Sequence, residues 1–376
     1  MHVVIAPDSF KGSLDAKSVA VRIQAVLKKK LPHAELTILP FSDGGEGGLD
    51  FLEQTFTGDT VWVDTQNASG EKIRAPYYRM GSKAWIELSQ AAGLTQLSPE
   101  KQDPLTTSTF GVGILLKHAL DSHISSLFLG IGGSATHDLG MGIYCALGGK
   151  VLDRNNQAFI PTGGTLNQIA VVDSSQLSPS LDRVQLQVVC DVPNPLTGPL
   201  GAAHVFAPQK GANSKTVALL EANSIQLGRL LESISGQPVL EFPGCGAAGG
   251  TAAGMKALLN GHLTSGFETF YRWANMDEIL KKADLLITGE GCLDRQSTRG
   301  KVPLSLAQKA QSFGTPTLIV CGQLKLDPKE LKKYGVLHCR SLIEEAQTLQ
   351  KAQEAASYWI DKATESLLKA YTNEQQ

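Results

Sequence analysis

Short apolar runs alternate with helical patterns along this chain, and this alternation constrains the fold more than any other feature. Residues 3–6 (VVIA) precede a helical pattern over residues 14–30, and residues 285–287 (LLI) precede another over residues 302–313. Apolar runs of this length are typical of strands buried on both faces. Strands that alternate with helices indicate a sheet covered by helices. We therefore predict an α/β fold with a doubly wound, parallel, Rossmann-like sheet.

The chain is too long for one ordinary hydrophobic core, which predicts two domains. Its 376 residues change texture over residues 61–88, where the pattern indicates hairpins. The last helical pattern, over residues 343–370, indicates one long packing helix. We assign to the Rossmann-like domain residues 1–60, 100–148 and 280–376, and to a second, mixed α/β domain residues 61–99 and 149–279.

Charge and cysteine content exclude several classes of protein. The formal net charge is −2, so no global field recruits nucleic acid or an anionic membrane, and an anionic substrate needs a local cationic pocket. No apolar run approaches the ~20 residues of a membrane span, and the N-terminal residues indicate a first strand, not a signal peptide. The 6 cysteines are widely spaced, which indicates free thiols in a reducing cytoplasm and no structural zinc site.

The loop that follows residues 285–287 carries the densest chemistry. Two acids, Glu290 and Asp294, are followed by three bases, Arg295, Arg299 and Lys301. Carboxylates that hold a metal, beside cations that hold phosphate, suit phosphoryl transfer, where catalysis is mostly positioning and charge stabilisation. Open α/β sheets bind their ligands at such strand-end loops. A solvated surface turn is the alternative interpretation.

Two N-terminal loops carry similar groups. Asp8, Ser9 and Lys11 follow the first predicted strand, where a lysine can reach a phosphate or a carboxylate as a point charge. Asp8 could hold a metal or accept a substrate hydroxyl, and the alternative is that Asp8 and Ser9 cap a turn. Asp43 lies in the string SDGGEGG, where it could meet Mg²⁺ or a hydroxyl; a glycine turn with solvated acids is the alternative there.

The glycine-rich string GIGGSAT allows two interpretations. It fits G-x-G-x-x-A between a strand and a predicted helix, and Asp153 lies where a ribose-binding acid belongs, which together indicate a nicotinamide-dependent oxidoreductase. Asp138, however, falls in the first turn of that predicted helix, where it would repel a pyrophosphate. A nucleoside triphosphate with Mg²⁺ tolerates this acid better, and its phosphates would then be cradled by the amides of Gly132, Gly133 and Ser134.

Two later segments carry isolated polar groups. Asp191 and Asn194 lie in the string CDVPNP at a strand end, and Lys210 lies in a later glycine loop. Asp191 is a candidate general base, with a capping role as the alternative. Residues 244–254 (GCGAAGGTAAG) could form a phosphate loop or a helix packed closely through glycine and alanine.

Taken together and in this order, six strings resemble the bacterial glycerate kinase family of the glycerate 2-kinase type. They are APDSFKGS at the N-terminus, SDGGEG, GIGGSAT, CDVPNPL, PQKGA, and GEGxLDxQS followed by RGK. The resemblance covers nearly the whole chain. It implies a discontinuous two-domain α/β fold with the site in a cleft, and phosphorylation of D-glycerate by ATP with Mg²⁺, usually to 2-phosphoglycerate.

The resemblance, read with the loops above, gives a set of expected site residues with four roles. Catalytic roles are expected for Lys11, Asp191, Asp294 and Lys301. Substrate binding is expected for Asp8, Ser9 and Arg299. Nucleotide binding is expected for Gly132, Gly133, Ser134 and Glu290, and metal binding for Asp43 and Asp294.

The sequence departs from the family pattern at three positions. His137 and Asp103 stand where asparagine is usual, and Cys292 stands where arginine is usual. Cys292 matters most, because a neutral thiol cannot replace a guanidinium fork on a phosphate or carboxylate; the nearby bases of the same loop would have to compensate. These departures leave open a non-catalytic sensor of small acids. The expected partners are ATP and glycerate, and nothing in the sequence indicates an oligomeric state.

Overall fold

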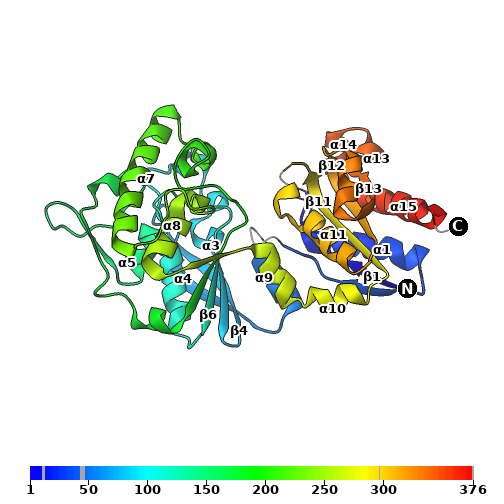
Figure 1. Ribbon diagram of the computed structural model, residues 1–376, viewed down its shortest axis with the longest axis horizontal. Helices are drawn as coiled ribbons and strands as arrows, with labels where there is room; N and C mark the ends of the chain where they lie inside the picture. Colours follow the sequence, from blue (N-terminus) through cyan, green and yellow to red (C-terminus); the bar gives the residue numbers. More distant parts are fainter. Residues whose placement is uncertain (11–12, 43–46, 296, 375–376) are drawn as a thin grey trace. The chain divides into compact units, whose positions relative to one another are not determined.

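The chain forms two compact units, each with its own sheet and core (Figure 1). The structure, a computed structural model, describes residues 1–10, 13–42, 47–295 and 297–374. Lys11 and Asp43 lie outside the described residues, as does the side chain of Arg299. The first unit combines both ends of the chain, Met1–Asp43 and Phe267–Gln376, and the second unit is Gly44–Gly266.

The first unit is built on a five-stranded parallel sheet. Its strands lie in the order β13 (Val336–Ser341), β12 (Thr317–Leu324), β11 (Leu285–Leu293), β1 (His2–Ile5) and β2 (Glu35–Ile38). From the adjacent strands β1 and β11 the chain proceeds outward in opposite directions, so the sheet is doubly wound, as predicted. A topological switch point therefore lies between β1 and β11.

Helices cover both faces of this sheet, and strand β12 shows why. Leu318 and Val320 of β12 share a core with α1 (Ala16–Lys30) and α15 (Ala356–Glu374), whereas Ile319 packs with α11 (Val302–Ser312). Successive strand residues point to opposite faces, so the two cores lie on opposite sides of the sheet. The remaining helices of the unit are α9 (Gly266–Trp273), α10 (Met276–Lys281), α12 (Pro328–Leu331), α13 (Leu342–Ala346) and α14 (Leu349–Glu354).

Two helix predictions in this unit were wrong in detail. The segment predicted as one helix over residues 343–370 is three helices, α13, α14 and α15, because Gln347 takes a left-handed φ of 69° after α13. Thr348 then caps α14 by accepting a hydrogen bond from the Lys351 amide. At the other end of the chain, α1 is capped by Asp15 and not by Ser13.

The second unit is built on a six-stranded mixed sheet. Its strands lie in the order β10 (His262–Thr264), β9 (Gln185–Val189), β6 (Ser126–Gly130), β5 (Lys83–Glu87), β4 (Lys72–Met80) and β3 (Asp59–Gln66). Strands β3, β4 and β5 are the predicted antiparallel hairpins, and β5, β6, β9 and β10 run parallel. A separate antiparallel pair comprises β7 (Lys150–Leu152) and β8 (Val171–Asp173).

The segment 100–148 lies in this second unit, so its predicted place in the Rossmann-like domain was wrong. Its strand β6 pairs with β5 on one side and β9 on the other. The βα rhythm that suggested the assignment is real, because α4 (Phe110–Leu120) connects the parallel strands β5 and β6. Such a rhythm identifies a βαβ unit but does not determine which sheet the unit joins. Residues 47–60 also belong to the second unit, and residues 267–279, predicted for the second domain, belong to the first unit.

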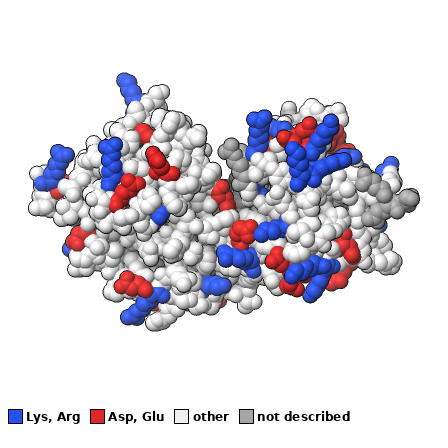
Figure 2. All heavy atoms as spheres, viewed as in Figure 1, with Lys and Arg blue, Asp and Glu red and all other residues white. Residues whose placement is uncertain are grey.

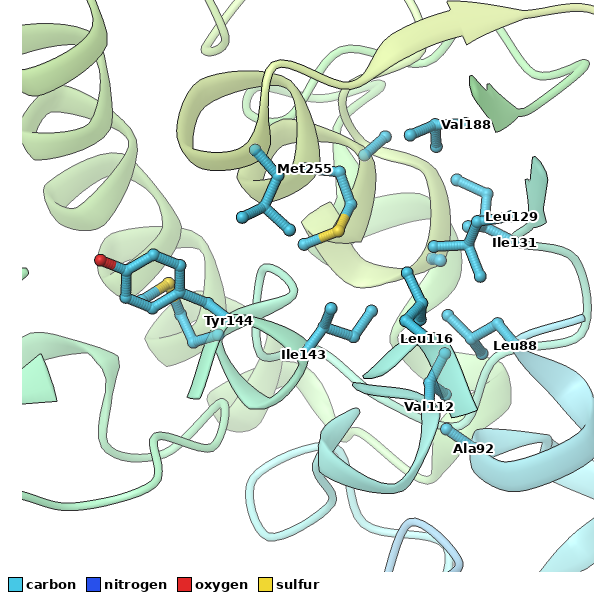
Figure 3. Packing of buried hydrophobic residues seen from close by; sticks show 14 of the residues in the cluster. Leu88, Ala92, Val112, Leu116, Leu129, Ile131, Ile143, Tyr144, Val188 and Met255 are labelled. Carbon is cyan, nitrogen blue, oxygen red and sulfur yellow. The ribbon is translucent and has the colours of Figure 1, made fainter. Parts of the chain in front are cut away.

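Helices of the second unit pack around a large apolar core. They are α2 (Gly48–Thr55), α3 (Ser89–Ala92), α4, α5 (Met141–Ala146), α6 (Ala202–Phe206), α7 (Ser214–Ser235) and α8 (Ala247–Leu259). Figure 3 shows Met255 of α8, Ile143 of α5 and Leu116 of α4 close together in this core, with Leu129 of β6 nearby. In this core the parallel strands of the second unit pack against its helices.

The surface carries mixed charge. Figure 2 shows basic and acidic side chains interspersed over the visible face of each unit. Among the described residues, no helix has the length and apolarity needed to span a membrane.

Candidate active site

A pocket of about 320 Å³ opens at the carboxyl ends of β1, β11 and β12 in the first unit. Asp8 and Ser9 line it from the loop after β1, and Glu290, Gly291 and Cys292 line it from the end of β11. Lys301 lines it from the start of α11. Four predicted site residues, Asp8, Ser9, Glu290 and Lys301, therefore meet here beside the half-buried end of β12. The pocket therefore lies at the topological switch point, where doubly wound sheets bind their ligands.

Two glycines let the strands approach closely enough to shape this end of the sheet. A Cβ on Gly289 would lie 2.1 Å from the carbonyl oxygen of Val320, and a Cβ on Gly322 would lie 2.4 Å from that of Gly291. Neither distance is compatible with a side chain, because both atoms met are backbone. The Asp8 amide donates to the Gly289 carbonyl at 2.8 Å, which holds the loop after β1 beside β11.

Glu290 is the most unusual group in the pocket, because its carboxylate is only 4% exposed. Lys301 Nζ lies 3.4 Å from its Oε2, whereas Oε1 has no hydrogen-bond partner among the described residues. Burial raises the pKa of Glu290, and the Lys301 charge opposes that rise. An orphaned oxygen on a buried acid leaves a place for a donor or a cation.

Asp8 and Glu290 are the two carboxylate residues that line this pocket, and they are the described residues that could hold a magnesium ion together with other oxygens. Asp8 is largely buried, and its Oδ1 accepts a hydrogen bond from the Ser9 amide at 2.6 Å. The described residues contain no group of three or more acids, histidines or cysteines that could hold a metal by themselves. Mg²⁺ is typically bound by one or two carboxylates plus phosphate and water oxygens, which is the set that this pocket can offer.

Cys292 lines the same pocket, at the position where the family usually has arginine. Burial raises the pKa of its thiol, and the charge of Lys325, which also lines the pocket, opposes that rise. The thiol Sγ lies 3.9 Å from Asp294 Oδ2. Asp294 itself does not line the pocket; its amide donates to Ser297 Oγ at 3.1 Å. Lys325 is thus a cation in the same pocket as Cys292, and the sequence analysis did not predict a role for it.

The glycine string GIGGSAT lies in the second unit, after β6, and no helix follows it directly. The next helix, α5, begins only at Met141. The side chain of Asp138 is fully buried and accepts hydrogen bonds from the amides of Thr109, Gly140 and Gly142 at 2.7, 3.1 and 3.3 Å. Asp138 therefore caps the chain ahead of α5, and burial raises its pKa.

The dinucleotide-binding interpretation of this string is wrong, because its structural context is missing. That motif needs a helix N-terminus at the glycines and an acid at the end of the neighbouring strand. Asp153 follows β7, which belongs to the separate two-stranded sheet. Its carboxylate accepts hydrogen bonds from the amides of Asn155 and Gln157, at 2.8 and 2.9 Å. Asp153 therefore stabilises a turn.

Asp191 and residues 244–254 are also placed in the second unit. Both carboxylate oxygens of Asp191 accept from the Gly266 amide, at 3.1 and 3.0 Å, which is a capping contact at the start of α9. A role for Asp191 as a base stays a prediction. Residues 244–254 lead into and form part of α8, and a Cβ on Gly254 would lie 1.9 Å from the Leu139 carbonyl oxygen. Ala248, Gly249 and Gly250, however, take left-handed φ angles of 52°, 61° and 82°, so the glycine-rich part of the segment is a turn and only the residues after it form a closely packed helix.

Two buried ionisable residues were not given a role by sequence reasoning. Lys210 is 1% exposed and donates from Nζ to Ser134 Oγ and to the Thr136 carbonyl, both at 2.7 Å. Burial lowers its pKa to about 7, and the Asp138 charge opposes that change. Beside it, burial and then the Lys210 charge lower the pKa of His137 to about 3, so this imidazole is neutral.

Glu87 is the second of these residues and ends strand β5. It accepts hydrogen bonds from the Leu49 amide at 2.7 Å, and from Trp85 Nε1 and Gln90 Nε2 at 3.3 Å. Burial raises its pKa, and the bond from Leu49 opposes that rise. A lone glutamate directly after the apolar run of a strand is the sequence signal that could have pointed to it.

The fold and the pocket define an α/β protein equipped for phosphoryl transfer, and comparison with known proteins specifies the family. The family model described as "Glycerate kinase family" matches residues 3–372. The chain therefore belongs to the glycerate kinase family, as the sequence strings predicted.

Individual relatives agree over nearly full length. The glycerate kinase of Halalkalibacterium halodurans is 37% identical over 367 residues, which is 97% of each chain. The glycerate 2-kinase of Escherichia coli K12 is 36% identical over 369 residues, 98% of this chain and 97% of that one. The crystal structure of a protein assigned as glycerate kinase 2 from Salmonella typhimurium LT2 superimposes with a TM-score of 0.85 at 35% identity, covering 100% of this chain and 99% of that one.

Proposed function

We propose that this protein is an ATP-dependent glycerate kinase that transfers the γ-phosphoryl group of Mg·ATP to a hydroxyl of D-glycerate and gives 2-phosphoglycerate. The observation that carries this proposal is the family match over residues 3–372. The product is suggested by the relative named glycerate 2-kinase. The pocket supports the same chemistry, because it combines a buried carboxylate, a second carboxylate and a lysine at the switch point of the sheet.

Lys301 would stabilise negative charge on the transferring group. Its Nζ lies beside Glu290, and the side chain is 28% exposed at the pocket, so the ammonium can reach a bound phosphate without leaving its partner. Asp8 and Glu290 would hold Mg²⁺, which supplies charge neutralisation and orientation of the phosphates when bound. Ser9 would donate its hydroxyl to substrate from the same loop.

Other predicted residues keep their roles as proposals. Asp294 would orient a hydroxyl or bind the metal from the loop after β11, and Asp191 would act as the base. An ionised carboxylate has about four lone-pair sites, so the Gly266 contact leaves acceptor capacity on Asp191. Lys11, Asp43 and Arg299 retain their expected roles in charge stabilisation, metal binding and substrate binding.

A coupled assay tests the proposal. Purified protein should release ADP only when D-glycerate and Mg²⁺ are both present, and equal release with and without glycerate would contradict the kinase function. Coupling the product to enolase directly, in parallel with coupling through phosphoglycerate mutase, identifies the hydroxyl. A direct enolase signal is expected for 2-phosphoglycerate, and a signal that requires the mutase would assign the 3-hydroxyl instead.

Binding measurements separate catalysis from sensing. Glycerate that binds in calorimetry while no ADP appears under any metal would favour the small-acid sensor. The same assay with other C3 and C4 hydroxyacids, run on the wild type and on Cys292→Arg, measures how far Cys292 changes the substrate preference.

A further inference from the structure

A buried ammonium group lies directly behind the glycine turn of the second unit. Lys210 Nζ donates to two oxygens of the segment that follows β6, Ser134 Oγ and the Thr136 carbonyl, both at 2.7 Å. Among the described residues, no ion pair to a carboxylate is formed by this Nζ, and Asp138 is the acid whose charge raises the pKa of Lys210. Burial lowers the pKa of Lys210 to about 7 because a buried cation without a paired anion is costly. An anion bound close by would favour the charged form, so the geometry leaves room for one to complete the site.

The turn in front of Lys210 presents open backbone donors. Within the described part of the chain, the amides of Gly132, Gly133 and Ser134 donate to no acceptor. Gly133 has a left-handed φ of 67°, and successive amides in such a turn form the concave anion-binding arrangement called a nest. Gly133 is exposed and Gly132 is half-buried, so a ligand can reach these donors from solvent.

The turn is also held in place by contacts on two sides. The Leu94 amide donates to the Gly133 carbonyl, and the Ala135 amide donates to the Ala92 carbonyl, both at 2.8 Å. On another side, a Cβ on Gly249 would lie 2.1 Å from the Thr136 carbonyl oxygen, so the start of α8 is packed against the turn. Donors fixed in advance need no reorganisation when charge arrives, which is what makes such a site effective.

We propose that the turn Gly132–Ser134 binds an oxyanion, either a phosphate of the nucleotide or the carboxylate of glycerate, and that Lys210 is the positioning residue that charges and holds this turn from behind. Lys210 is too deeply buried to touch the ligand. It acts through Ser134 and Thr136 by fixing their oxygens and by its field, which a low-dielectric interior screens only weakly. The identity of the ligand rests on the proposed function, but the oxyanion site itself does not.

The wild-type protein tests the site without any substitution. Protein labelled with ¹⁵N-glycine is titrated separately with sulfate, with D-glycerate and with a non-hydrolysable ATP analogue plus Mg²⁺, and the Gly132 and Gly133 amide signals are followed by NMR. We expect both signals to move with sulfate and with one of the two substrates, which identifies the source of the oxyanion. If neither signal moves with any of the three probes, the site is refuted. Movement with sulfate in a protein that lacks glycerate kinase activity would uphold the site and reject the proposed function.

Lys210→Met, with Lys256→Met as the matched control, tests the positioning role. Lys256 is a lysine of the same unit. Its Nζ donates a hydrogen bond to Gln237 Oε1 at 2.6 Å, which is not part of the turn. Lys210→Met should raise KM for the substrate identified by NMR about 10- to 100-fold and leave KM for the other within about 2-fold, since a charge is removed from one subsite only. Lys256→Met should change neither KM. Equal KM values in Lys210→Met and wild type would overturn the role of Lys210, and if that variant does not fold, Ser134→Ala should give a smaller rise in the same KM.

Discussion

Replacing Lys301 by methionine separates its chemical role from its structural one. Lys301 is the partner of buried Glu290, 3.4 Å away, and we propose that it is also the cation of the phosphoryl-transfer pocket. Loss of one preorganised group that stabilises transition-state charge typically lowers kcat by about 10²- to 10³-fold. We expect a loss of that size in Lys301→Met.

The stability cost of the same substitution follows from the burial of its partner. Breaking a fully buried ion pair typically costs about 3–5 kcal/mol, but Lys301 is partly exposed, and Glu290 can take up a proton because burial already raises its pKa. These two effects reduce the expected cost to about 1–2 kcal/mol. For a unit of this size, that is a fall in melting temperature of roughly 2–8 °C.

The cost should also depend on pH in a defined direction. The Lys301 charge lowers the pKa of Glu290, so its removal raises that pKa further above the unfolded value. Between the unfolded and folded pKa values the folded state holds a proton that the unfolded state lacks, so stability falls as the pH rises through that window. Lys301→Met should therefore match the wild type at low pH and become progressively less stable towards neutral and higher pH.

The assay combines thermal melts from low pH to above neutral pH with steady-state kinetics at one pH. Adding Glu290→Gln to Lys301→Met should abolish the pH-dependent instability without restoring activity. Lys309→Met is the matched control, because Lys309 pairs with Glu268 at 3.2 Å on the exposed surface of the same unit, and such pairs contribute about 0–1 kcal/mol. Wild-type kcat in Lys301→Met would refute the catalytic role, and a stability deficit that does not vary with pH would refute the coupling to Glu290.

Three other changes probe the structure elsewhere. Glu87→Ala should destabilise the second unit by about 2–4 kcal/mol, because it leaves the buried donors of Leu49 and Trp85 unsatisfied, and Glu87→Gln, which keeps an acceptor, should cost less in thermal melts. Gly254→Ala gains about 1 kcal/mol of helix propensity but places a Cβ 1.9 Å from a backbone oxygen, so calorimetry should show a net loss of stability. Iodoacetamide should modify Cys292 slowly at neutral pH, because burial raises its pKa, and glycerate or Mg·ATP should slow it further in peptide mass spectrometry; an unchanged rate would argue against ligand binding in this pocket.

The sequence was most informative where chemistry and strand pattern coincide. The run at residues 285–287 is buried in β11, and the acids and lysine that follow it lie at the switch point of a doubly wound sheet, so the fold class was correctly predicted. That success has a local cause, because a buried parallel strand is continuously apolar and its ligand loop begins where the apolar run ends.

The errors have a common cause in contacts between distant segments. The βα rhythm of residues 100–148 was read correctly, but its sheet was not, since strand pairing depends on residues far away in the chain. The helix expected directly after GIGGSAT is absent because Asp138 is used as a buried cap ahead of α5. Lys210 could not be singled out for a role because a lysine gains its special chemistry only from burial, and that burial comes from segments more than 70 residues away in sequence.

Each unit contains an unusual buried ionisable group, and the two groups suit opposite kinds of ligand charge. Phosphoryl transfer requires one place that attracts a cation and another that attracts an oxyanion. Glu290, a buried acid with an orphaned oxygen in the first unit, provides the first kind of place. Lys210, a buried base behind three open amides in the second unit, provides the second kind. Burying Glu290 and Lys210 does not stabilise the protein without ligands, because the contacts of each group offset only part of the free energy lost when its charge leaves water. Both are understandable if the missing compensation comes from the ligands. Saturating Mg²⁺ with nucleotide, or glycerate, should therefore raise the melting temperature more in the wild type than in variants that lack these two groups, because those variants bind the ligands more weakly.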